Sequence, residues 1–264
     1  MMPLPDAADP LELLEVAREA AAAGAAVLAR RSSGNLNAVN KSADGDWVTD
    51  FDRAAEVAVR EVLARLRPHD VVMGEELEAS VPANPSGIRW SIDPLDGTTN
   101  FIRDIVYYAT SVAAVNDDGE WLAGVVHAPA LVRVYSAARG HGSWLSAHGS
   151  VRKLTGPDPQ RVGKLLGTGF SYNADVRAEQ YVALPELAGQ FADVRRLGSA
   201  ALDLCMVADG TLDAYIERSL NEYDYAAGAL IAEEAGVPVK RPPRPANDAE
   251  REDAVTVAGA ALLG

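Results

Sequence analysis

The residues best suited to chemistry lie in the segment WSIDPLDGTTNF, residues 90–101. Asp93 and Asp96 are three residues apart across a proline turn, so both carboxylates can point at one locus, with the Leu95 carbonyl as a third oxygen. Hard divalent cations, magnesium in particular, prefer clustered oxygens of this kind. Gly97 and Thr98 then supply backbone N–H groups where a helix could begin, a natural place to bind an anion. Taken alone, the segment fits an ordinary Asp-Pro and Asp-Gly turn equally well.

Three further acidic clusters favour a site over a plain turn. Gly74–Glu76 (GEE) directly follows the apolar strand VVM, which puts carboxylates at the C-terminal end of that strand. Asp224 begins an alanine-rich helix, and Asp52 heads another helix within KSADGDWVTDFD. Either aspartate could serve only as an N-cap, and GEE could be a solvated loop. The four clusters together indicate a carboxylate-rich site.

Two of these segments, DPLDGTTNF and YDYAAGALIAEEAG, resemble the paired signature motifs of the inositol monophosphatase family. GEE and the pattern K-x4-D-x2-T-x2-D, which begins at Lys41, are the family's other landmarks. All four occur in the family's order and at its usual separations. The similarity continues through RRLGSAALDLCMVADGTLDAYIE and covers roughly residues 10 to 260. One departure is Tyr223, where the family usually has tryptophan.

The resemblance implies two magnesium ions, bridged by Asp93, and a third, weaker one near Glu76. The implied metal ligands are Glu76, Asp93, the Leu95 carbonyl, Asp96 and Asp224. The implied catalytic residues are Asp52, Thr98 and Glu76, where Asp52 hydrogen-bonds Thr98 and Thr98 helps to orient the attacking water. The implied substrate-binding residues are Asp96, Gly97, Thr98, Ala200, Glu217 and Asp224. Lys41 matches a basic residue beside the metal cluster.

The expected activity is magnesium-dependent hydrolysis of inositol monophosphate to inositol and phosphate by a metal-activated water. A phosphate monoester dianion repels hydroxide, so its hydrolysis requires charge neutralisation and a water aligned with the leaving oxygen. Two cations bridged by one carboxylate provide both. Positioning and electrostatics carry phosphoryl transfer, and no nucleophilic side chain is required. The resemblance also implies inhibition by lithium.

Other functions stay open. Relatives hydrolyse histidinol phosphate, fructose 1,6-bisphosphate or phosphoadenosine phosphate. Glu217 suits a polyol leaving group, but it also suits the cationic amine of histidinol phosphate, which is therefore the second candidate. A bisphosphate would need further cations, and Arg195–Arg196 is the only suggestive pair. A catalytically silent interaction module is the alternative from another class; against it, every implied ligand position carries an oxygen donor.

The composition limits the classes of partner that the protein is expected to bind. The chain has 264 residues and a net charge of −14, which argues against nucleic acid and anionic membranes as partners. A bound divalent cation would still allow a small phosphorylated substrate. No uncharged apolar run approaches the roughly 20 residues of a membrane span, and no basic n-region of a signal peptide is visible. The single cysteine, Cys205, fits a cytoplasmic protein. Four histidines outside the motifs favour an oxygen site over zinc, and the resemblance implies a homodimer.

The pattern of apolar residues predicts the elements that position these groups. Helical spacing predicts helices over residues 11–28, 52–67, 175–190, 199–208 and 224–235. Short apolar runs and turn signals predict strands over residues 71–75, 88–93, 164–170, 212–217 and 254–259, and hairpins over 110–129 and 132–146. Residues 241–253 are expected to form a polar surface loop. The resemblance gives the fold class, an α+β, layered αβαβα sandwich of the sugar-phosphatase type. It forms one domain, residues 1–264, with two αβ halves, roughly 1–150 and 151–264.

Overall fold

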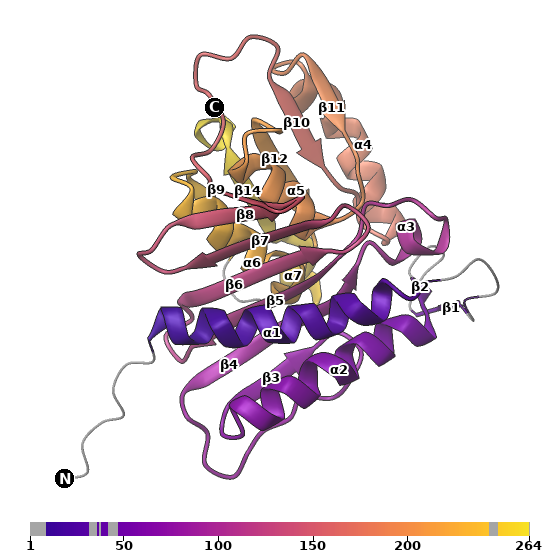
Figure 1. The fold of residues 1–264 in the computed structure, drawn as a ribbon. Coiled ribbons are helices and arrows are strands. Elements are labelled where there is room, and N and C mark those ends of the chain that lie inside the picture. Colours follow the sequence, from indigo (N-terminus) through magenta and orange to yellow (C-terminus); the bar gives the residue numbers. More distant parts are fainter. Residues whose placement is uncertain (1–8, 32–35, 37, 42–46, 243–247, 264) are drawn as a thin grey trace.

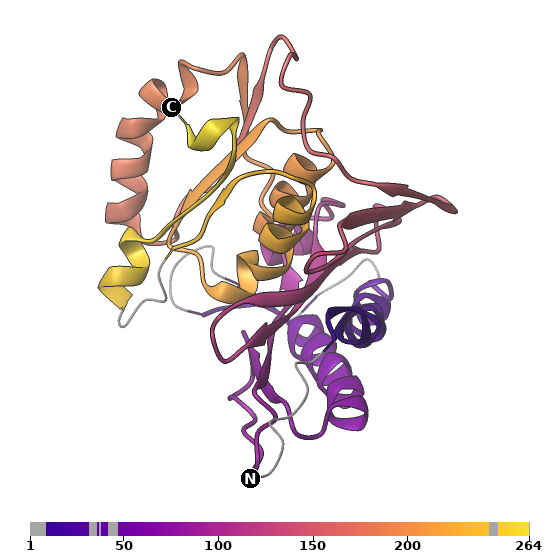
Figure 2. The same cartoon turned by 90° about the vertical axis from the view of Figure 1, so that its left-hand side faces the viewer.

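Helices and sheets alternate in five layers (Figures 1 and 2). The structure is a computed structural model that describes residues 9–31, 36, 38–41, 47–242 and 248–263. A first pair of helices, a seven-stranded sheet, a second pair of helices, a five-stranded sheet and an outer helical layer follow one another. The structure therefore confirms the predicted αβαβα sandwich.

The first layer consists of α1 (Pro10–Leu28) and α2 (Asp50–Leu66), which cover one face of the seven-stranded sheet. Thr49 caps α2, because its hydroxyl accepts a hydrogen bond from the Phe51 amide, which has no partner within the helix. A two-stranded sheet, β1 (Val39–Asn40) and β2 (Trp47–Val48), precedes α2. Apolar residues at helical spacing are buried between the helices and the sheet, among them Leu13, Leu14, Val59 and Leu63.

The seven-stranded sheet has the order β3-β4-β5-β6-β7-β8-β9. β3 and β4 are parallel, and every other neighbouring pair is antiparallel. Since β3 and β4 run in the same direction, the residues at their C-terminal ends lie at the same edge of the sheet. The strands are β3 (Val71–Gly74), β4 (Ile88–Asp96), β5 (Ala109–Asn116), β6 (Trp121–Ala128), β7 (Arg133–Ala138), β8 (Ser143–Ala147) and β9 (Ser150–Lys153).

The middle layer consists of α5 (Ala200–Ala208) and α6 (Glu222–Glu234), between the two sheets. Small residues allow close packing here. A Cβ atom added to Gly228 of α6 would lie 2.8 Å from the Ala201 carbonyl oxygen, and one added to Gly124 of β6 would lie 2.9 Å from the Ala227 Cα atom. The alanine-rich composition thus holds α6 tightly against both α5 and the first sheet, which fixes where the two helices begin.

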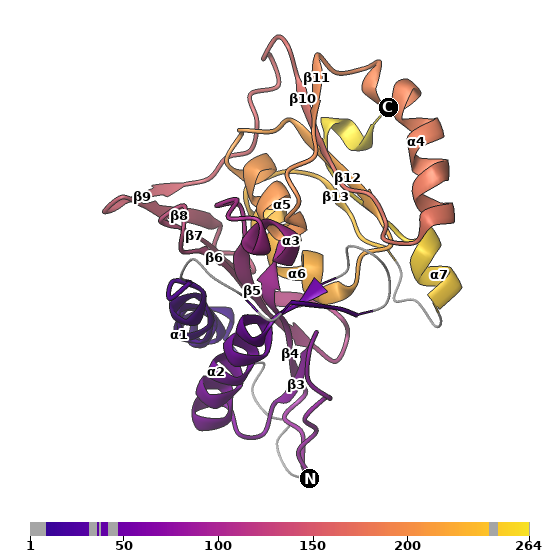
Figure 3. The ribbon, with the colours of Figure 1, turned by 90° about the vertical axis from the view of Figure 1, so that its right-hand side faces the viewer.

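The five-stranded sheet has the order β11-β10-β12-β14-β13. β10 is parallel to both β11 and β12, whereas β14 is antiparallel to β12 and β13. α4 (Ala174–Ala188) and α7 (Asp248–Asp253) lie on the outer side of this sheet, away from α5 and α6 (Figure 3). The strands are β10 (Leu165–Thr168), β11 (Asp193–Arg195), β12 (Ala214–Arg218), β13 (Val239–Lys240) and β14 (Val255–Gly259), and a short 3-10 helix, η1 (Ala260–Leu262), follows β14.

The structure confirms the predicted helices and strands of both sheets, with small shifts at their ends. One expectation is wrong in part: residues 248–253 of the expected loop form α7, while residues 243–247 lie outside the described residues. The short strands β9, β11 and β13 carry too few residues for a periodic signal. The two sheets come from residues 71–153 and 165–259, and the single-domain description stays a prediction. Among the described residues, no helix is both long and apolar enough to cross a bilayer.

Candidate active site

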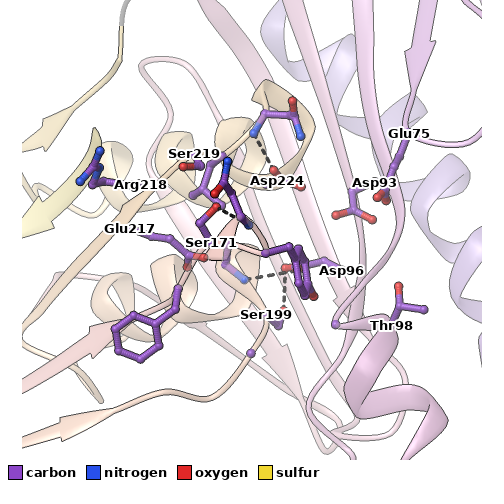
Figure 4. A pocket seen from close by; sticks show the side chains of 18 of the residues that line it. Glu75, Asp93, Asp96, Thr98, Ser171, Ser199, Glu217, Arg218, Ser219 and Asp224 are labelled. Carbon is purple, nitrogen blue, oxygen red and sulfur yellow. Dashed lines mark hydrogen bonds between the residues drawn. The ribbon is translucent and has the colours of Figure 1, made fainter. Parts of the chain in front are cut away.

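A pocket of about 930 Å³ lies where the two sheets come together (Figure 4). Both sheets turn the C-terminal ends of parallel strands toward it: β3 and β4 on one wall, and β11, β10 and β12 on the other. The first residues of α5 and α6 line the pocket between these walls. Ligands commonly bind beyond the carboxyl ends of parallel strands, and helix N-termini favour anions. The position therefore suits a phosphorylated ligand.

A bulge at the end of β4 brings both of its aspartates into the pocket. In a regular strand, residues three apart face opposite sides of the sheet. Here the pairing with β5 shifts between Asp93 and Asp96, and both side chains line the pocket. Two hydrogen bonds hold the bulge: the Leu95 amide donates to Asp93 Oδ1 at 3.0 Å, and the Thr110 hydroxyl donates to the Pro94 carbonyl at 2.9 Å.

The carboxylate of Asp96, the last residue of β4, lies at the N-terminus of α5. Its Oδ2 atom accepts hydrogen bonds from the Ser199 hydroxyl and the Ala201 amide, both at 2.7 Å, and its Oδ1 atom accepts one from the Ala200 amide at 3.3 Å. Burial raises the pKa of Asp96 to about 6, although these hydrogen bonds stabilise the ionised form. The Ala200 amide, predicted to face the substrate, thus donates to Asp96 in this structure.

Ser199→Ala should lower the melting temperature of the metal-free protein by about 2–8 °C, which corresponds to a lost N-cap of roughly 1–2 kcal/mol in a chain of this size. The Ser199 side chain is buried and supports both Asp96 and the Leu202 amide of α5. Thermal unfolding in EDTA measures the effect. Ser150→Ala, at the exposed first residue of β9, is the control and should leave the melting temperature nearly unchanged. An equal melting temperature for both variants would contradict the capping role.

Thr98 and Asp52 form a hydrogen-bonded pair beside the two aspartates. The Thr98 hydroxyl oxygen lies 3.0 Å from Asp52 Oδ1 and 3.0 Å from the Leu95 carbonyl oxygen. Asp52 Oδ2 accepts hydrogen bonds from the Thr49 amide at 2.7 Å and the Thr49 hydroxyl at 2.6 Å. Asp52 is therefore the predicted partner of Thr98, but it is not the N-cap: Thr49 caps α2, and Asp52 completes the capping box from the third position of the helix. Burial raises the pKa of Asp52 above its ordinary value.

Asp224 enters the pocket from the first turn of α6. Its Oδ2 atom accepts a hydrogen bond from the Asn221 amide at 2.6 Å, which completes a capping box. Glu222, the first residue of α6, forms an ion pair with Arg89 of β4. The start of α6 is therefore attached to the strand that carries Asp93. The side chains of Asp93 and Asp224 thus occupy fixed positions on neighbouring elements.

The acidic groups of this wall repel one another. Burial raises the pKa of Asp93 well above its ordinary value, and Glu75, Asp96 and Asp224 raise it further. Asp224 behaves in the same way, because burial, Glu75 and Asp96 all favour its protonated form. Such clustered carboxylates are unfavourable unless a cation neutralises them. Their arrangement therefore favours a site for a positively charged ligand.

The opposite wall carries Glu217 at the end of β12. Its Oε2 atom accepts a hydrogen bond from the Tyr215 hydroxyl at 2.5 Å, and burial raises the pKa of Glu217. A Cβ atom at Gly169, just beyond β10, would overlap the Glu217 carboxylate, so a larger residue there would displace Glu217 from this position. The predicted substrate residue Glu217 thus faces the same pocket as Asp96, Gly97, Thr98, Ala200 and Asp224.

The sequence profile described as "Inositol monophosphatase family" matches residues 9–258. The chain belongs to the inositol monophosphatase family. Inositol-1-monophosphatase SuhB of Mycobacterium tuberculosis is 42% identical over 247 aligned residues, covering 88% of this chain and 84% of that protein. Nus factor SuhB of Escherichia coli K12 is 36% identical, covering 80% and 81%. The crystal structure of extragenic suppressor protein suhB from Bartonella henselae matches with a TM-score of 0.83, at 31% identity, covering 94% and 93% of the two chains.

Within this inositol monophosphatase fold, two predicted site residues do not line the pocket: Asp52, which is fully buried and reaches it only through Thr98, and Glu76. Glu75 lines the pocket, whereas Glu76 does not, although GEE was predicted to present Glu76. The Glu76 side chain is 4% exposed, and its amide donates to Glu56 Oε2 at 2.7 Å. Both residues lie in the bend that follows β3, and of the two only Glu75 reaches the pocket. We therefore transfer the roles predicted for Glu76 to Glu75.

Lys41 connects these two glutamates. Its ammonium group lies 2.8 Å from Glu75 Oε1 and also forms an ion pair with Glu76. Burial alone would lower the pKa of Lys41, but the attraction to Glu75 and Glu76 outweighs this and raises it. Lys41 is therefore charged and partly balances the acidic wall. Asp46 of the same motif lies outside the described residues.

The donor set fits a hard divalent cation. The carboxylates of Glu75, Asp93, Asp96 and Asp224 line one pocket together with Leu95. Oxygen donors in this number suit magnesium, which takes one or two carboxylates together with water and phosphate. Among the described residues, however, no three Asp, Glu, His or Cys side chains already surround a single point at metal-ligand spacing. Side-chain rotations would therefore have to accompany metal binding.

The sequence analysis did not identify Asn100, which connects two loops beside the site. Its side-chain amide donates to the Tyr107 carbonyl at 2.7 Å and to the Leu197 carbonyl at 2.8 Å, and so links the loops that precede β5 and α5. The available signal was its place directly after Gly97–Thr99 in the motif. Gly97 itself has φ +99°, and a Cβ atom there would lie 3.0 Å from the Tyr107 carbonyl oxygen, so the turn requires glycine.

Proposed function

We propose that this chain is a magnesium-dependent phosphatase that hydrolyses inositol monophosphate to inositol and phosphate. One observation carries the proposal: four carboxylates, on the ends of β3 and β4 and the start of α6, face one pocket beside the Asp52–Thr98 pair. Family membership supports a hydrolase of the phosphatase class. Magnesium and the substrate are the parts that this proposal adds.

Five residues would hold the magnesium ions: Glu75, Asp93, Leu95 through its carbonyl, Asp96 and Asp224. Bound magnesium supplies Lewis-acid stabilisation of phosphate charge and lowers the pKa of a bound water. The chain's own contribution starts from Asp52, which accepts a hydrogen bond from the Thr98 hydroxyl. The Thr98 oxygen then has a lone pair with which to accept a hydrogen bond from a water molecule, and this orients the water. The Gly97 and Thr98 amides are proposed to bind the phosphate oxygens.

The leaving-group side favours a polyol over an amine. Tyr215 occupies Oε2 of Glu217, and Oε1 remains able to accept hydrogen bonds from the hydroxyls of inositol. Histidinol phosphate, the second candidate, is also compatible with this carboxylate through its cationic amine. The charge of Arg196, however, acts on Glu217 and lowers its pKa against the effect of burial. A cationic leaving group would be repelled by Arg196, which supports inositol monophosphate.

A magnesium titration with two substrates tests the proposal. The purified protein is freed of metal with EDTA, and phosphate release from inositol 1-phosphate and from histidinol phosphate is measured as magnesium is restored. We expect no release without magnesium and a kcat/KM for inositol 1-phosphate at least about 10-fold higher than for histidinol phosphate, the effect of roughly 1.4 kcal/mol.

Each other outcome has a defined meaning. A higher kcat/KM for histidinol phosphate would replace the substrate and keep the chemistry. If neither substrate, nor a generic monoester, releases phosphate with magnesium, the chain is an interaction module, and the relative named as a Nus factor becomes the relevant comparison. The homodimer, the cytoplasmic location and the sensitivity to lithium stay predictions.

A further inference from the structure

We propose that Glu56 and Arg60 of α2 are positioning residues: their buried ion pair holds the segment that carries Glu75 and so sets the affinity of the pocket for magnesium. Neither residue lines the active-site pocket, so the pair acts through the chain that follows β3 and not by contact with a ligand. This inference rests on the proposed function, in which Glu75 is a metal ligand, and it adds the residues that keep this ligand in place.

The buried face of α2 carries two acidic side chains one helical turn apart. Asp52 and Glu56 are both 0% exposed, and residues four apart lie on the same face of a helix. Asp52 reaches Thr98, which follows the end of β4. Glu56 reaches the residues that follow β3, the parallel neighbour of β4. One face of α2 therefore contacts both strand ends of the first sheet that supply acidic residues to the pocket.

Each oxygen of the Glu56 carboxylate has a hydrogen-bond donor. Oε1 accepts from Arg60 Nε at 2.7 Å, within an ion pair along α2, and Oε2 accepts from the Glu76 amide at 2.7 Å. Arg60 Nη2 donates in turn to the Leu77 carbonyl at 3.1 Å. The ion pair thus binds backbone groups of the two residues that follow Glu75, whose own side chain lines the pocket.

Gly74, the last residue of β3, lets the carboxylate approach the chain on the other side of Glu75. A Cβ atom at Gly74 would overlap the Glu56 carboxylate, so an alanine there would displace it. Gly74 does not have a positive φ, so its backbone conformation is open to other residues. The close approach of Glu56 therefore accounts for the glycine of the segment Gly74–Glu76.

A buried ion pair is not the simplest way to stabilise the contact between α2 and β3. Removing two charges from water is costly, and apolar residues of similar volume often replace such a pair without loss of stability. Apolar side chains, however, cannot accept the Glu76 amide or donate to the Leu77 carbonyl. These two hydrogen bonds to the backbone beside Glu75 are what the charged pair adds, and they indicate that it serves the position of the metal ligand.

The test measures the magnesium dissociation constant of the metal-free protein by isothermal titration calorimetry, and kcat and KM for inositol 1-phosphate. Glu56→Gln should raise the dissociation constant by about 10- to 100-fold, because glutamine offers one acceptor oxygen to two donors. At saturating magnesium, kcat and KM should stay within about threefold of the wild type, since Glu56 lies outside the pocket. Glu61→Gln, exposed on the same helix, is the matched control and should leave all three quantities within about twofold.

Two further variants separate positioning from stability. The double variant Glu56→Met and Arg60→Met removes both charges at similar volume, so its melting temperature in EDTA should stay within about 4 °C of the wild type while its magnesium dissociation constant rises as in Glu56→Gln. Gly74→Ala should raise the dissociation constant by about tenfold in the wild type, but by less than about twofold in a Glu56→Ala background, where no carboxylate is left to displace.

The outcomes are distinct. An unchanged dissociation constant in Glu56→Gln or in the double variant, with the fold confirmed by circular dichroism, would overturn the inference, and so would equal effects of Gly74→Ala in both backgrounds. If Glu56→Gln does not fold, the double variant decides; a double variant that does not fold would show that the pair serves the core instead. Failure of the proposed function appears in the wild type, as an absence of magnesium binding or of phosphate release from inositol 1-phosphate.

Discussion

Asp93→Asn should reduce kcat by at least about 10³-fold and, at the same time, stabilise the metal-free protein. Asp93 is 2% exposed, and its carboxylate is surrounded by Glu75, Asp96 and Asp224. Loss of a ligand carboxylate removes several kcal/mol of charge stabilisation, and each 1.36 kcal/mol is a factor of ten in rate. The amide has the same shape and can still accept the Leu95 hydrogen bond, so the bulge of β4 should survive.

The stabilisation follows from the raised pKa of Asp93. A carboxyl group with a higher pKa in the folded state binds its proton more tightly there, so folding becomes less favourable as pH rises from the unfolded pKa to the folded pKa. Asparagine does not ionise, so the variant lacks this loss of folding free energy at high pH. In EDTA we therefore expect the variant to melt above the wild type by more than about 2 °C at pH 8, which corresponds to roughly 1 kcal/mol, and the difference to shrink toward pH 4.

The control is Asp118→Asn, an equivalent change in the exposed turn between β5 and β6. It should alter neither kcat nor the melting temperature. Wild-type turnover in Asp93→Asn would defeat the proposed function. Lower metal-free stability at pH 8, with activity lost, would show that Asp93 is held by favourable contacts rather than strained by its acidic neighbours.

The parts of the fold that were predictable share one property: their signal is local. The helical spacing of Leu13, Leu14, Val59 and Leu63 identifies α1 and α2, and apolar runs bounded by turns identify the hairpins. The strand β11, with three residues, has no such period and exists because β10 pairs with it. α7 is polar and has only six residues, so composition alone indicated a loop.

The sequence predicts those parts of the site that lie within its motifs. Asp93, Asp96 and Asp224 were found because their spacing and their places at strand and helix ends are encoded in the sequence. Which of the two consecutive glutamates enters the pocket depends on where β3 ends and on the bend that follows it, which the sequence pattern does not specify. A one-residue uncertainty at an element boundary is harmless for the fold and decisive for the site.

The last expected result separates those two glutamates. Glu75→Gln should lower kcat by about 10²- to 10³-fold, as removal of a few kcal/mol of transition-state stabilisation does, and should raise the magnesium concentration needed for half-maximal activity. Glu76→Gln should lower kcat by less than about tenfold, because the Glu76 side chain does not line the pocket and its carboxylate pairs with Lys41.

The two variants are matched controls for each other: both residues are glutamates next to one another in the chain, both form an ion pair with Lys41, and glutamine preserves their size. Both substitutions therefore weaken an ion pair with Lys41. A difference in kcat between the two variants then measures the contribution of the glutamate that lines the pocket. Burial raises the pKa of Glu76 to about 7, with hydrogen bonding to Lys41 opposing it, so the comparison is made at pH 8.5, where Glu76 is ionised. A loss in Glu76→Gln equal to that in Glu75→Gln, accompanied by the same shift in magnesium requirement, would return the ligand role to Glu76 and would mean that metal binding rearranges the end of β3.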